Sequence, residues 1–570
     1  MSQEATLPIW AEELKLRYLS GEASMFLLHG NVRDVYPWRA ADGTTHYVPL
    51  RRFLEEFFGR SKDIVGYYNV SEGLQFPDKK TTARFRAVVN ARRTLQGKAP
   101  VASLPTSISG VLPIVEDMIT NVTQSSAMII DYTETIVPMG DLSYMSEADK
   151  VNLVSMQRWS SDPGLLHSDN LVVLITENLA DVHRRVVAST QLAAVSVPLP
   201  TDAERLGFIE ASDLSGIEME MEAEALAKVT AGLTLVQIRG LFRRARQSGE
   251  CITFRAVSRR KKSIIEQECH GLVEFVDPSH DFSHVGGMQR LKDDLMRVAA
   301  AIKSGRTNQV PMGIIFVGPM GTGKTFLAEA FAAESGLTCL KFKNFREKWV
   351  GSTEGNLEKI LQVVDGLGYV LLIIDEADRS MSSGSEGDGG TSSRVIARIK
   401  EFMSDTSHRG RVVILMLTNR PDKLDTDLKR PGRFDLKIPF FHPEDNTERE
   451  AILNALTRKN KLDMEEAIDM ELIAEATEGH SGAELESVLL GAAGVAAAAD
   501  RDVISQADLE QAVIDVIPSR DTRMLEFMEM LAVFESSSRR MLPARYKEIP
   551  TDEVHTRLDQ LRAALGRRVL

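Results

Sequence analysis

Short apolar runs alternate with stretches of helical periodicity along the chain. In the first half, AMII precedes Asp131 and LVVLIT precedes Glu177, and in the second, VLLII precedes Asp375 and VVILML precedes Thr418. Continuous apolar runs of this length are typical of strands buried on both faces, and strands alternating with helices indicate a parallel sheet. The pattern therefore predicts the α/β fold class.

The same order of features occurs twice, over about 125–200 and again over 370–450. In each copy, a run ending in an acid is followed by a second run, a β-rich segment closing in proline, and an acidic helix start. Thr230-Ala231-Gly232 and Thr477-Glu478-Gly479 then each precede an amphipathic helix, and corresponding positions are separated by nearly the same number of residues. A repeat this long predicts duplicated domains, and two unrelated α/β domains are the alternative.

The repeat predicts tandem modules, each a parallel sheet followed by a helical lid. We expect the joint between them to run through 258–263 (SRRKKS) and 276–287, which are rich in charge and turn residues. The basic run is either a solvated patch or a site for an acidic partner. The expected segments are 1–20, an α/β domain at 21–205, a lid-like region and linker at 206–269, a second α/β domain at 270–445, its lid at 446–518, and a helical extension at 519–570, which is either packed or an oligomer contact.

Composition narrows the class of protein. A chain of 570 residues exceeds what one hydrophobic core organises. Its net charge of −13 argues against coating nucleic acid or anionic membrane. No apolar run approaches a membrane span, the N-terminus lacks the pattern of a secretory signal, and the 3 cysteines form no CxxC pair. We expect a cytoplasmic protein.

The segment 318–325, GPMGTGKT, matches G-x-x-x-x-G-K-[ST] and lies between a predicted strand and a predicted helix. In that context glycines let backbone N–H groups converge on phosphates, Lys324 would reach the β- and γ-phosphates, and Thr325 would ligate Mg²⁺. A simple glycine-rich turn is the alternative. The candidate nucleotide-binding residues are Pro319, Met320, Gly321, Thr322, Gly323, Lys324, Thr325 and Phe326.

Five further polar positions lie at the ends of apolar runs or in turns. Asp375 would orient water on magnesium, and Glu376 is the candidate base for the attacking water. Asn419, at the next strand end, could hold that water or the γ-phosphate, and otherwise would be a turn residue. Arg430 and Arg433 are either surface charges or fingers that neutralise transition-state charge.

The second half resembles an AAA+ ATPase of the branch that contains FtsH, the proteasomal ATPases and valosin-containing protein. The motifs that carry this resemblance, over about 270–518, are Val285-Gly286-Gly287, the Walker A loop 318–325, Walker B 371–376, Leu417–Pro421, Leu428–Asp435 and Gly479–Ala483.

The resemblance implies a ring, usually a hexamer, with ATP and Mg²⁺ as cofactors and tandem AAA+ modules as its architecture. Asn419 would be sensor 1, and Arg430 and Arg433 would act in trans on the neighbour's nucleotide. Val285 and Gly286, with Gly482 and Ala483 of the lid, would border the adenine.

The resemblance also places a first pore loop at Lys348-Trp349-Val350-Gly351 and a second at 382–392. Such an aromatic would grip an extended polypeptide, although Trp349 alone would be interpreted as a core residue. Three positions depart from the family pattern: Leu456 where a histidine is common, His480 where an aromatic is commoner, and Glu484 where aspartate is frequent.

The first half keeps the pattern of strands and lacks the chemistry. Gly30 to Asp34 follows its first strand with no P-loop lysine, Tyr132 stands where Glu376 would, and no RPGR segment follows Asn178. We interpret 21–265 as a degenerate AAA+-like module that serves as a second ring tier, a recognition platform or a brace; an unrelated adaptor domain is the alternative. We expect no hydrolysis there, and weak nucleotide binding stays open.

The leading hypothesis is an ATP-driven protein unfoldase or remodeller acting through a pore on an unidentified client. The alternatives are an ATP-dependent assembly scaffold or maturation factor and, disfavoured by the acidic charge, a nucleic-acid motor. No HExxH motif or protease nucleophile is found in the sequence.

Overall fold

The computed structural model describes residues 7–40, 42–269, 271–342, 353–380, 391–519 and 521–566. The chain divides into two compact units, the first made of 1–268 with 354–366 and the second of 269–353 with 367–570. The pore-loop prediction at Lys348, Trp349 and Val350, and most of that at 382–392, lie outside the described residues.

The first unit is built on a six-stranded sheet with the order β5-β4-β6-β7-β1-β8. All neighbours pair in parallel except β4 and β5, which are antiparallel. A separate hairpin, β2–β3, follows β1 directly. The strands are β1 (Met25–Gly30), β2 (Val35–Arg39), β3 (Thr45–Pro49), β4 (Ile64–Asn69), β5 (Gly73–Gln75), β6 (Ser126–Ile130), β7 (Asn170–Ile175) and β8 (Leu192–Val197).

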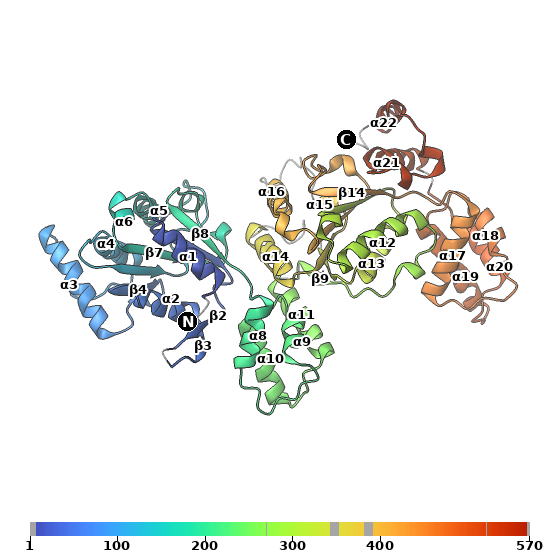
Figure 1. Ribbon diagram of the computed structural model, residues 1–570. Coiled ribbons are helices and arrows are strands. Elements are labelled where there is room, and N and C mark those ends of the chain that lie inside the picture. The colour runs from blue at the N-terminus through green and yellow to red at the C-terminus, as the bar shows by residue number, and fades with distance from the viewer. Residues whose placement is uncertain are drawn as a thin grey trace. The chain divides into compact units, whose positions relative to one another are not determined.

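Alternate residues of these strands face two hydrophobic clusters, as expected for a sheet covered on both sides. One cluster packs β-strand side chains against α3, α4 and α5, and the other packs them against α1, α2 and the hairpin. The helices around this sheet (Figure 1) are α1 (Ile9–Leu19), α2 (Leu50–Gly59), α3 (Lys79–Leu95), α4 (Ile108–Ile119), α5 (Glu147–Ser160), α6 (Pro163–His167) and α7 (Arg184–Val187), with short 3₁₀ turns η1 (Thr133–Thr135) and η2 (Leu179–Asp181).

A group of four helices completes the first unit: α8 (Asp202–Ala211), α9 (Ala223–Val229), α10 (Leu235–Ser248) and α11 (Phe254–Glu268). Thr201 and Thr234 begin α8 and α10 with capping boxes. Residues 258–263, where the expected joint begins, are helical and lie within α11. Val257 and Ile265 are buried at helical spacing on either side of Lys261, whose amino group donates to the carbonyl of Val229 (3.2 Å).

The second unit contains a six-stranded sheet of the same plan, with the order β14-β10-β13-β12-β11-β9. Its five parallel strands follow the chain order of the first sheet, whereas the edge strand β9 precedes them in the chain and β5 lies between β4 and β6. Its strands are also parallel except for the edge pair, β11 and β9. The position of each strand in the sheet therefore corresponds: β10 to β1, β12 to β6 and β13 to β7. The strands are β9 (Val273–Phe275), β10 (Gly313–Val317), β11 (Thr338–Phe342), β12 (Val370–Ile374), β13 (Val412–Thr418) and β14 (Phe434–Pro439).

One face of this sheet packs against α12 and α13 in a single cluster that includes Phe316 and Phe331. The helices around the sheet are α12 (Gln289–Lys303), α13 (Lys324–Ser335), α15 (Ala377–Ser380) and α16 (Thr391–Ser404), and α14 (Thr353–Leu367) lies between β11 and β12 in the chain. The lid helices (Figure 1) are α17 (Asn446–Asn460), α18 (Met470–Ala476), α19 (Gly482–Ala498) and α20 (Gln506–Asp515). The 3₁₀ turns are η3 (Phe282–His284), η4 (Thr307–Gln309), η5 (Thr406–His408) and η6 (Pro421–Lys423).

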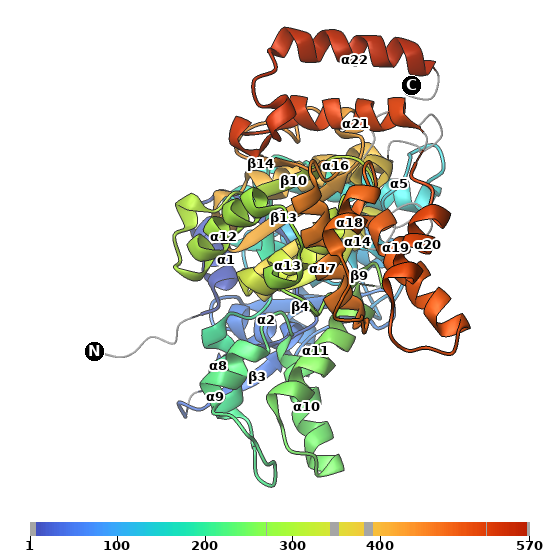
Figure 2. The same cartoon turned by 90° about the vertical axis from the view of Figure 1, so that its right-hand side faces the viewer.

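The last part of the chain packs against the second unit's sheet. In it α22 (Thr551–Leu565) runs alongside α21 (Thr522–Glu535), with η7 (Arg539–Met541) and η8 (Ala544–Tyr546) between them (Figure 2). Phe527, Met530 and Leu558 belong to their shared core, and α21 also contacts β14. Among the described residues, no helix combines the length and apolarity needed to cross a bilayer.

The two lids share an internal hydrogen bond as well as a helix order. In the first, the buried Arg205 donates from Nε to the carbonyl of Ala227 (2.8 Å), and in the second Arg449 donates to that of Ala474 (2.7 Å). Since the same polar residue occupies the same place in both cores, the two units share a packing scheme as well as a topology.

Candidate nucleotide-binding site

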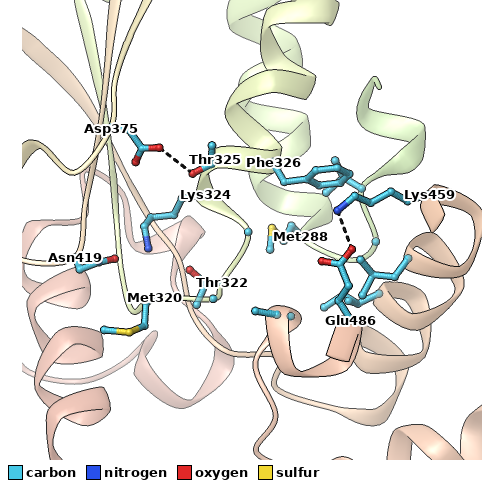
Figure 3. A pocket seen from close by; sticks show the side chains of 18 of the residues that line it. Met288, Met320, Thr322, Lys324, Thr325, Phe326, Asp375, Asn419, Lys459 and Glu486 are labelled. Atoms are coloured by element: carbon cyan, nitrogen blue, oxygen red, sulfur yellow. Dashed lines mark hydrogen bonds and ion pairs between the residues drawn. The ribbon is translucent and has the colours of Figure 1, made fainter. Parts of the chain in front are cut away.

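The second unit contains a cavity of about 870 Å³ between the carboxyl ends of its strands and the lid helices (Figure 3). The cavity is lined by all four residues predicted to border the adenine. It is also lined by every predicted residue of the Walker A loop except Pro319. Two residues that also line it, Lys341 and Lys459, were not predicted from the sequence. Among the predicted site residues, those lining the cavity are Val285, Gly286, Met320, Gly321, Thr322, Gly323, Lys324, Thr325, Phe326, Asp375, Glu376, Asn419, Gly482 and Ala483.

The loop between β10 and α13 carries the lysine of the motif. Lys324 is the first residue of α13, and its Nζ donates to the carbonyls of Gly318 (2.9 Å) and Pro319 (2.6 Å). Burial lowers the pKa of Lys324 to about 8, and the carboxylates of Asp375 and Asp378 oppose that shift. A buried ammonium held by neutral carbonyls beside a cavity is suited to an anionic ligand such as a phosphate chain.

Two glycines let the backbone of the site approach the lid closely. At Gly286, a Cβ would lie 2.3 Å from the carbonyl oxygen of Ala451, which is too close for any side chain. Gly321 has a φ of +77°, and its carbonyl accepts a hydrogen bond from the backbone N–H of Ala483 (3.2 Å). The Walker loop and the first turn of α19 are therefore directly joined.

Thr325 and Asp375 lie together, as predicted for a magnesium site. The Oγ1 of Thr325 is 3.4 Å from Oδ2 of Asp375, and the same carboxylate oxygen is 3.0 Å from Nζ of Lys341 on β11. Hydroxyl and carboxylate oxygens are suitable ligands for Mg²⁺ with its remaining waters. Within the described residues, no three His, Cys, Asp or Glu side chains gather into a metal-binding group.

Glu376 follows β12 in an unusual backbone conformation. Its φ is +47°, and its N–H donates to Oδ1 of Asp375 (2.9 Å). A non-glycine residue in this region stores strain, and such residues cluster at functional sites. The turn places the exposed Glu376 carboxylate at the cavity, next to a fixed Asp375.

Asn419 comes from the end of β13 and lines the same side of the cavity as Lys324 and Asp375 (Figure 3). Asp378 supports this strand end, because its Oδ1 accepts hydrogen bonds from Oγ1 of Thr418 (2.8 Å) and from the Asn419 backbone (3.4 Å). The structure thus brings together the carboxylates, amide and lysine predicted from separate motifs.

The opposite side of the cavity carries Phe326, Lys459 and Glu486 (Figure 3). Lys459 Nζ lies 4.8 Å from the centroid of the Phe326 ring and 3.0 Å from Oε1 of Glu486. His280 stacks on Phe326, with ring centroids 3.8 Å apart. Leu456, the predicted departure, lines this end, and Glu484 completes the capping box of α19 with Ser481. This end offers apolar and aromatic surface for a planar ring.

The predicted arginine fingers do not line the cavity. The Arg430 side chain is 74% exposed and pairs with Asp427 (3.1 Å), and Arg433 donates to the carbonyl of Asp427 (2.8 Å). Neither arginine therefore contributes to the wall of this cavity.

Sequence comparisons agree with this division of the chain. Residues 314–441, which include the Walker loop, Asp375 and Asn419, match the family described as "ATPase family associated with various cellular activities (AAA)". Residues 2–198 match "AAA+ chaperone, N-terminal Rossmann-like domain" and residues 203–270 match "AAA+ chaperone, second helical domain".

The chain belongs to the AAA+ ATPases.

This AAA+ ATPase is similar to several curated proteins. It is 33% identical over 254 residues to "ATP-dependent zinc metalloprotease FtsH 4" of Sorangium cellulosum, covering 43% of this chain and 39% of the relative. It is 33% identical over 248 residues to "Cell division cycle protein 48 homolog" of Archaeoglobus fulgidus, covering 43% and 33%. It is 29% identical over 349 residues to "ATPase family protein 2 homolog" of Caenorhabditis elegans, covering 58% and 47%. The match spans less than half the length of each of these relatives.

Proposed function

We propose that this AAA+ ATPase is a protein-remodelling motor that hydrolyses ATP in its second unit, assembles into a ring and threads polypeptide through a central pore. The observation that carries the proposal is that one cavity is lined by Lys324, Thr325, Asp375, Glu376 and Asn419. The named relatives, an FtsH protease and a cell division cycle 48 homologue, support the same class of activity.

The residues divide the work of hydrolysis between them. Lys324 neutralises the phosphate chain, Thr325 and Asp375 hold Mg²⁺ and its water, and the Glu376 carboxylate takes a proton from the attacking water. Asn419 orients that water or the γ-phosphate. Bound Mg²⁺ supplies charge neutralisation at the phosphates. At the other end of the cavity, Phe326 and Leu456 form the surface against which the adenine ring packs.

Arg430 and Arg433 would complete the site of a neighbouring subunit. They are placed outside their own cavity on an exposed loop, and hydrolysis gains from added positive charge at the transferring phosphoryl group. A ring, which we propose to be a hexamer, brings one subunit's loop to the next subunit's cavity.

We propose that the first unit neither binds nor hydrolyses ATP. Tyr132 repeats the backbone of Glu376, with φ of +55° and an N–H that donates to Oδ1 of Asp131 (2.7 Å), but it offers no carboxylate. Arg33 fills the position next to it, pairing with Asp131 (2.8 Å) and lying 4.0 Å above the Tyr132 ring. The Asp131 carboxylate is thus already neutralised by a cation of the chain, and we propose that the unit serves as a platform or brace.

The experiment that tests the motor uses Glu376→Gln, which removes the base and leaves the phosphate-binding groups intact. In saturating ATP this variant should bind nucleotide, lose turnover, and retain client protein that the wild type releases. Lys324→Ala is the matched control, because it should bind neither ATP nor client. If Glu376→Gln turns over ATP at the wild-type rate, the assignment of the base is wrong.

Trp349→Ala separates a motor from an assembly scaffold. A threading motor predicts near-normal ATP turnover with loss of client remodelling. Equal loss of both activities would contradict the pore role, and normal function of Glu376→Gln in cells would favour the scaffold, in which bound ATP suffices.

A further inference from the structure

One buried carboxylate in the C-terminal extension is paired with two lysines that flank the arginine loop. Glu535, the last residue of α21, is 7% exposed. One of its oxygens accepts from Nζ of Lys429, the residue directly before Arg430, and the other lies 3.2 Å from Nζ of Lys437 on β14. The loop that carries Arg430 and Arg433 is therefore tied at both of its ends to a single side chain.

Further contacts fix these ends to the extension. Lys429 also donates to the carbonyl of Pro421 (3.1 Å) at the start of η6. The backbone of Lys437 donates to Oγ of Ser537 (2.7 Å) and accepts from the Ser537 N–H (3.1 Å). Since α21 contacts both η6 and β14, the helix spans the base of the arginine loop.

Acidic residues hydrogen-bond to the arginine loop, while the Arg430 side chain remains exposed to solvent. Oδ1 of Asp435 accepts the N–H of Gly432 (2.6 Å), and Asp427 pairs with Arg430. These contacts are at the protein surface, where ion pairs contribute little to stability. The buried Glu535 pairing is different in kind, because removing one member leaves charge without a partner in a desolvated place.

We propose that Glu535 is a positioning residue for ATP hydrolysis, holding the arginine loop so that Arg430 and Arg433 reach the cavity of the neighbouring subunit. The C-terminal extension is then a working part of the ring's active site. This inference rests on the proposed action of the arginines in trans.

Glu535→Gln tests the inference, because the amide keeps the shape and loses the charge. Its own cavity is untouched, so affinity for a fluorescent ATP analogue should stay within about twofold, while kcat falls at least about tenfold because charge misplaced by an ångström loses much of its effect. Lys429→Met should behave alike. A matched control is Glu529→Gln, which removes another buried carboxylate of α21 whose partners, His442, Arg545 and Tyr546, lie outside the loop; it should lose thermal stability to a similar degree and keep its kcat.

Mixed rings separate this inference from the proposal beneath it. Lys324→Ala subunits have no working cavity but keep a correctly placed arginine loop. Glu535→Gln subunits keep a working cavity but have a misplaced arginine loop. Full-length chains mixed and reassembled should therefore show more ATP turnover than either variant alone. The double variant Arg430→Ala and Arg433→Ala, mixed with Lys324→Ala, reports on the trans arrangement itself. Recovery in both mixtures supports the inference, recovery only with the arginine variant overturns it, and recovery in neither overturns the trans arrangement together with it.

Discussion

The carboxylate of Asp375 has two neighbours that differ in charge. The Thr325 hydroxyl is compatible with a shared cation, whereas the Lys341 ammonium, 3.0 Å away, is itself a cation at the place where Mg²⁺ would bind. Both side chains of the ion pair are partly exposed, at 24% and 29%, so solvent screens their attraction and the pair exchanges readily. At the proposed Mg²⁺ site, Lys341 would therefore compete with the metal for one oxygen of Asp375.

Lys341→Met should lower the Mg²⁺ concentration that gives half-maximal ATP turnover by a few-fold, because Asp375 loses its competing partner. The measurement is an Mg²⁺ titration at fixed ATP, with Mg²⁺-dependent nucleotide binding as a second readout. Lys459→Met, at the other end of the cavity, is the control and should leave the Mg²⁺ requirement unchanged. A higher Mg²⁺ requirement in Lys341→Met would show that the lysine assists the phosphates instead.

At the scale of elements, the N-terminus of α10 is capped by a side chain that is distant in sequence, from the loop after β1. The carboxylate of Asp34, just after β1, accepts the N–H groups of Leu235 and Val236 (both 2.9 Å) and Nδ2 of Asn31 (3.0 Å). In the second unit, the first turn of α19 instead faces the Walker loop and the cavity. A fixed internal anion thus satisfies the helix N-terminus that corresponds to the one near the nucleotide site.

Asp34→Asn should destabilise the first unit by about 1–2 kcal/mol, the usual effect of losing a helix cap, because an amide can accept only with its one oxygen. Chemical denaturation measures the loss, and hydrogen exchange at Leu235 and Val236 locates it. Asp42→Asn is the control in the neighbouring hairpin, where the carboxylate is exposed. Equal stability of Asp34→Asn and wild type would contradict the bridging role.

The packing of α21 depends on the ionised form of Glu529. Burial alone would raise its pKa, but the hydrogen bonds from His442 and Tyr546 and the charge of Arg545 outweigh burial and hold the pKa below its ordinary value. Because the folded pKa is lower than the unfolded one, this stabilisation is fully present above about pH 4.3 and is lost as pH falls through the folded pKa.

The melting temperature of Glu529→Gln should therefore lie on the order of 5 °C below that of wild type at neutral pH, and the gap should narrow below about pH 4. Calorimetry across that pH range makes the comparison. Glu526→Gln, an exposed position of the same helix, should follow wild type throughout. A gap that stays constant on acidification would show that shape, not charge, is what Glu529 contributes.

At the scale of the whole molecule, the sequence predicted the strands and the local motifs. It did not predict the ion pairs between residues that are far apart in the chain. Apolar runs ending in Asp131 and Asp375 predicted both parallel sheets, and the Walker loop predicted one stretch of the cavity wall, from Met320 to Phe326. Lys341 and Glu535 escaped prediction because their partners lie many residues away and an isolated charge in sequence is usually solvated. The helix through Lys261 was not predicted because its basic run obscured the apolar spacing around it.

We expect the two units to differ in their ability to bind nucleotide. In the second, the ammonium of Lys324 lines the cavity and is held by neutral carbonyls of its own loop, whereas in the first Arg33 is paired with the Asp131 carboxylate, and Asp34 satisfies the start of α10. A nucleotide entering the first unit would have to break these pairings and would gain no Walker lysine. Glu376→Gln, which prevents turnover, should therefore bind one ATP per chain at saturation, measured by equilibrium dialysis. Adding Lys324→Ala to that variant should abolish the binding altogether, whereas residual binding of similar affinity in the double variant, or two ATP per chain, would place a second nucleotide in the first unit.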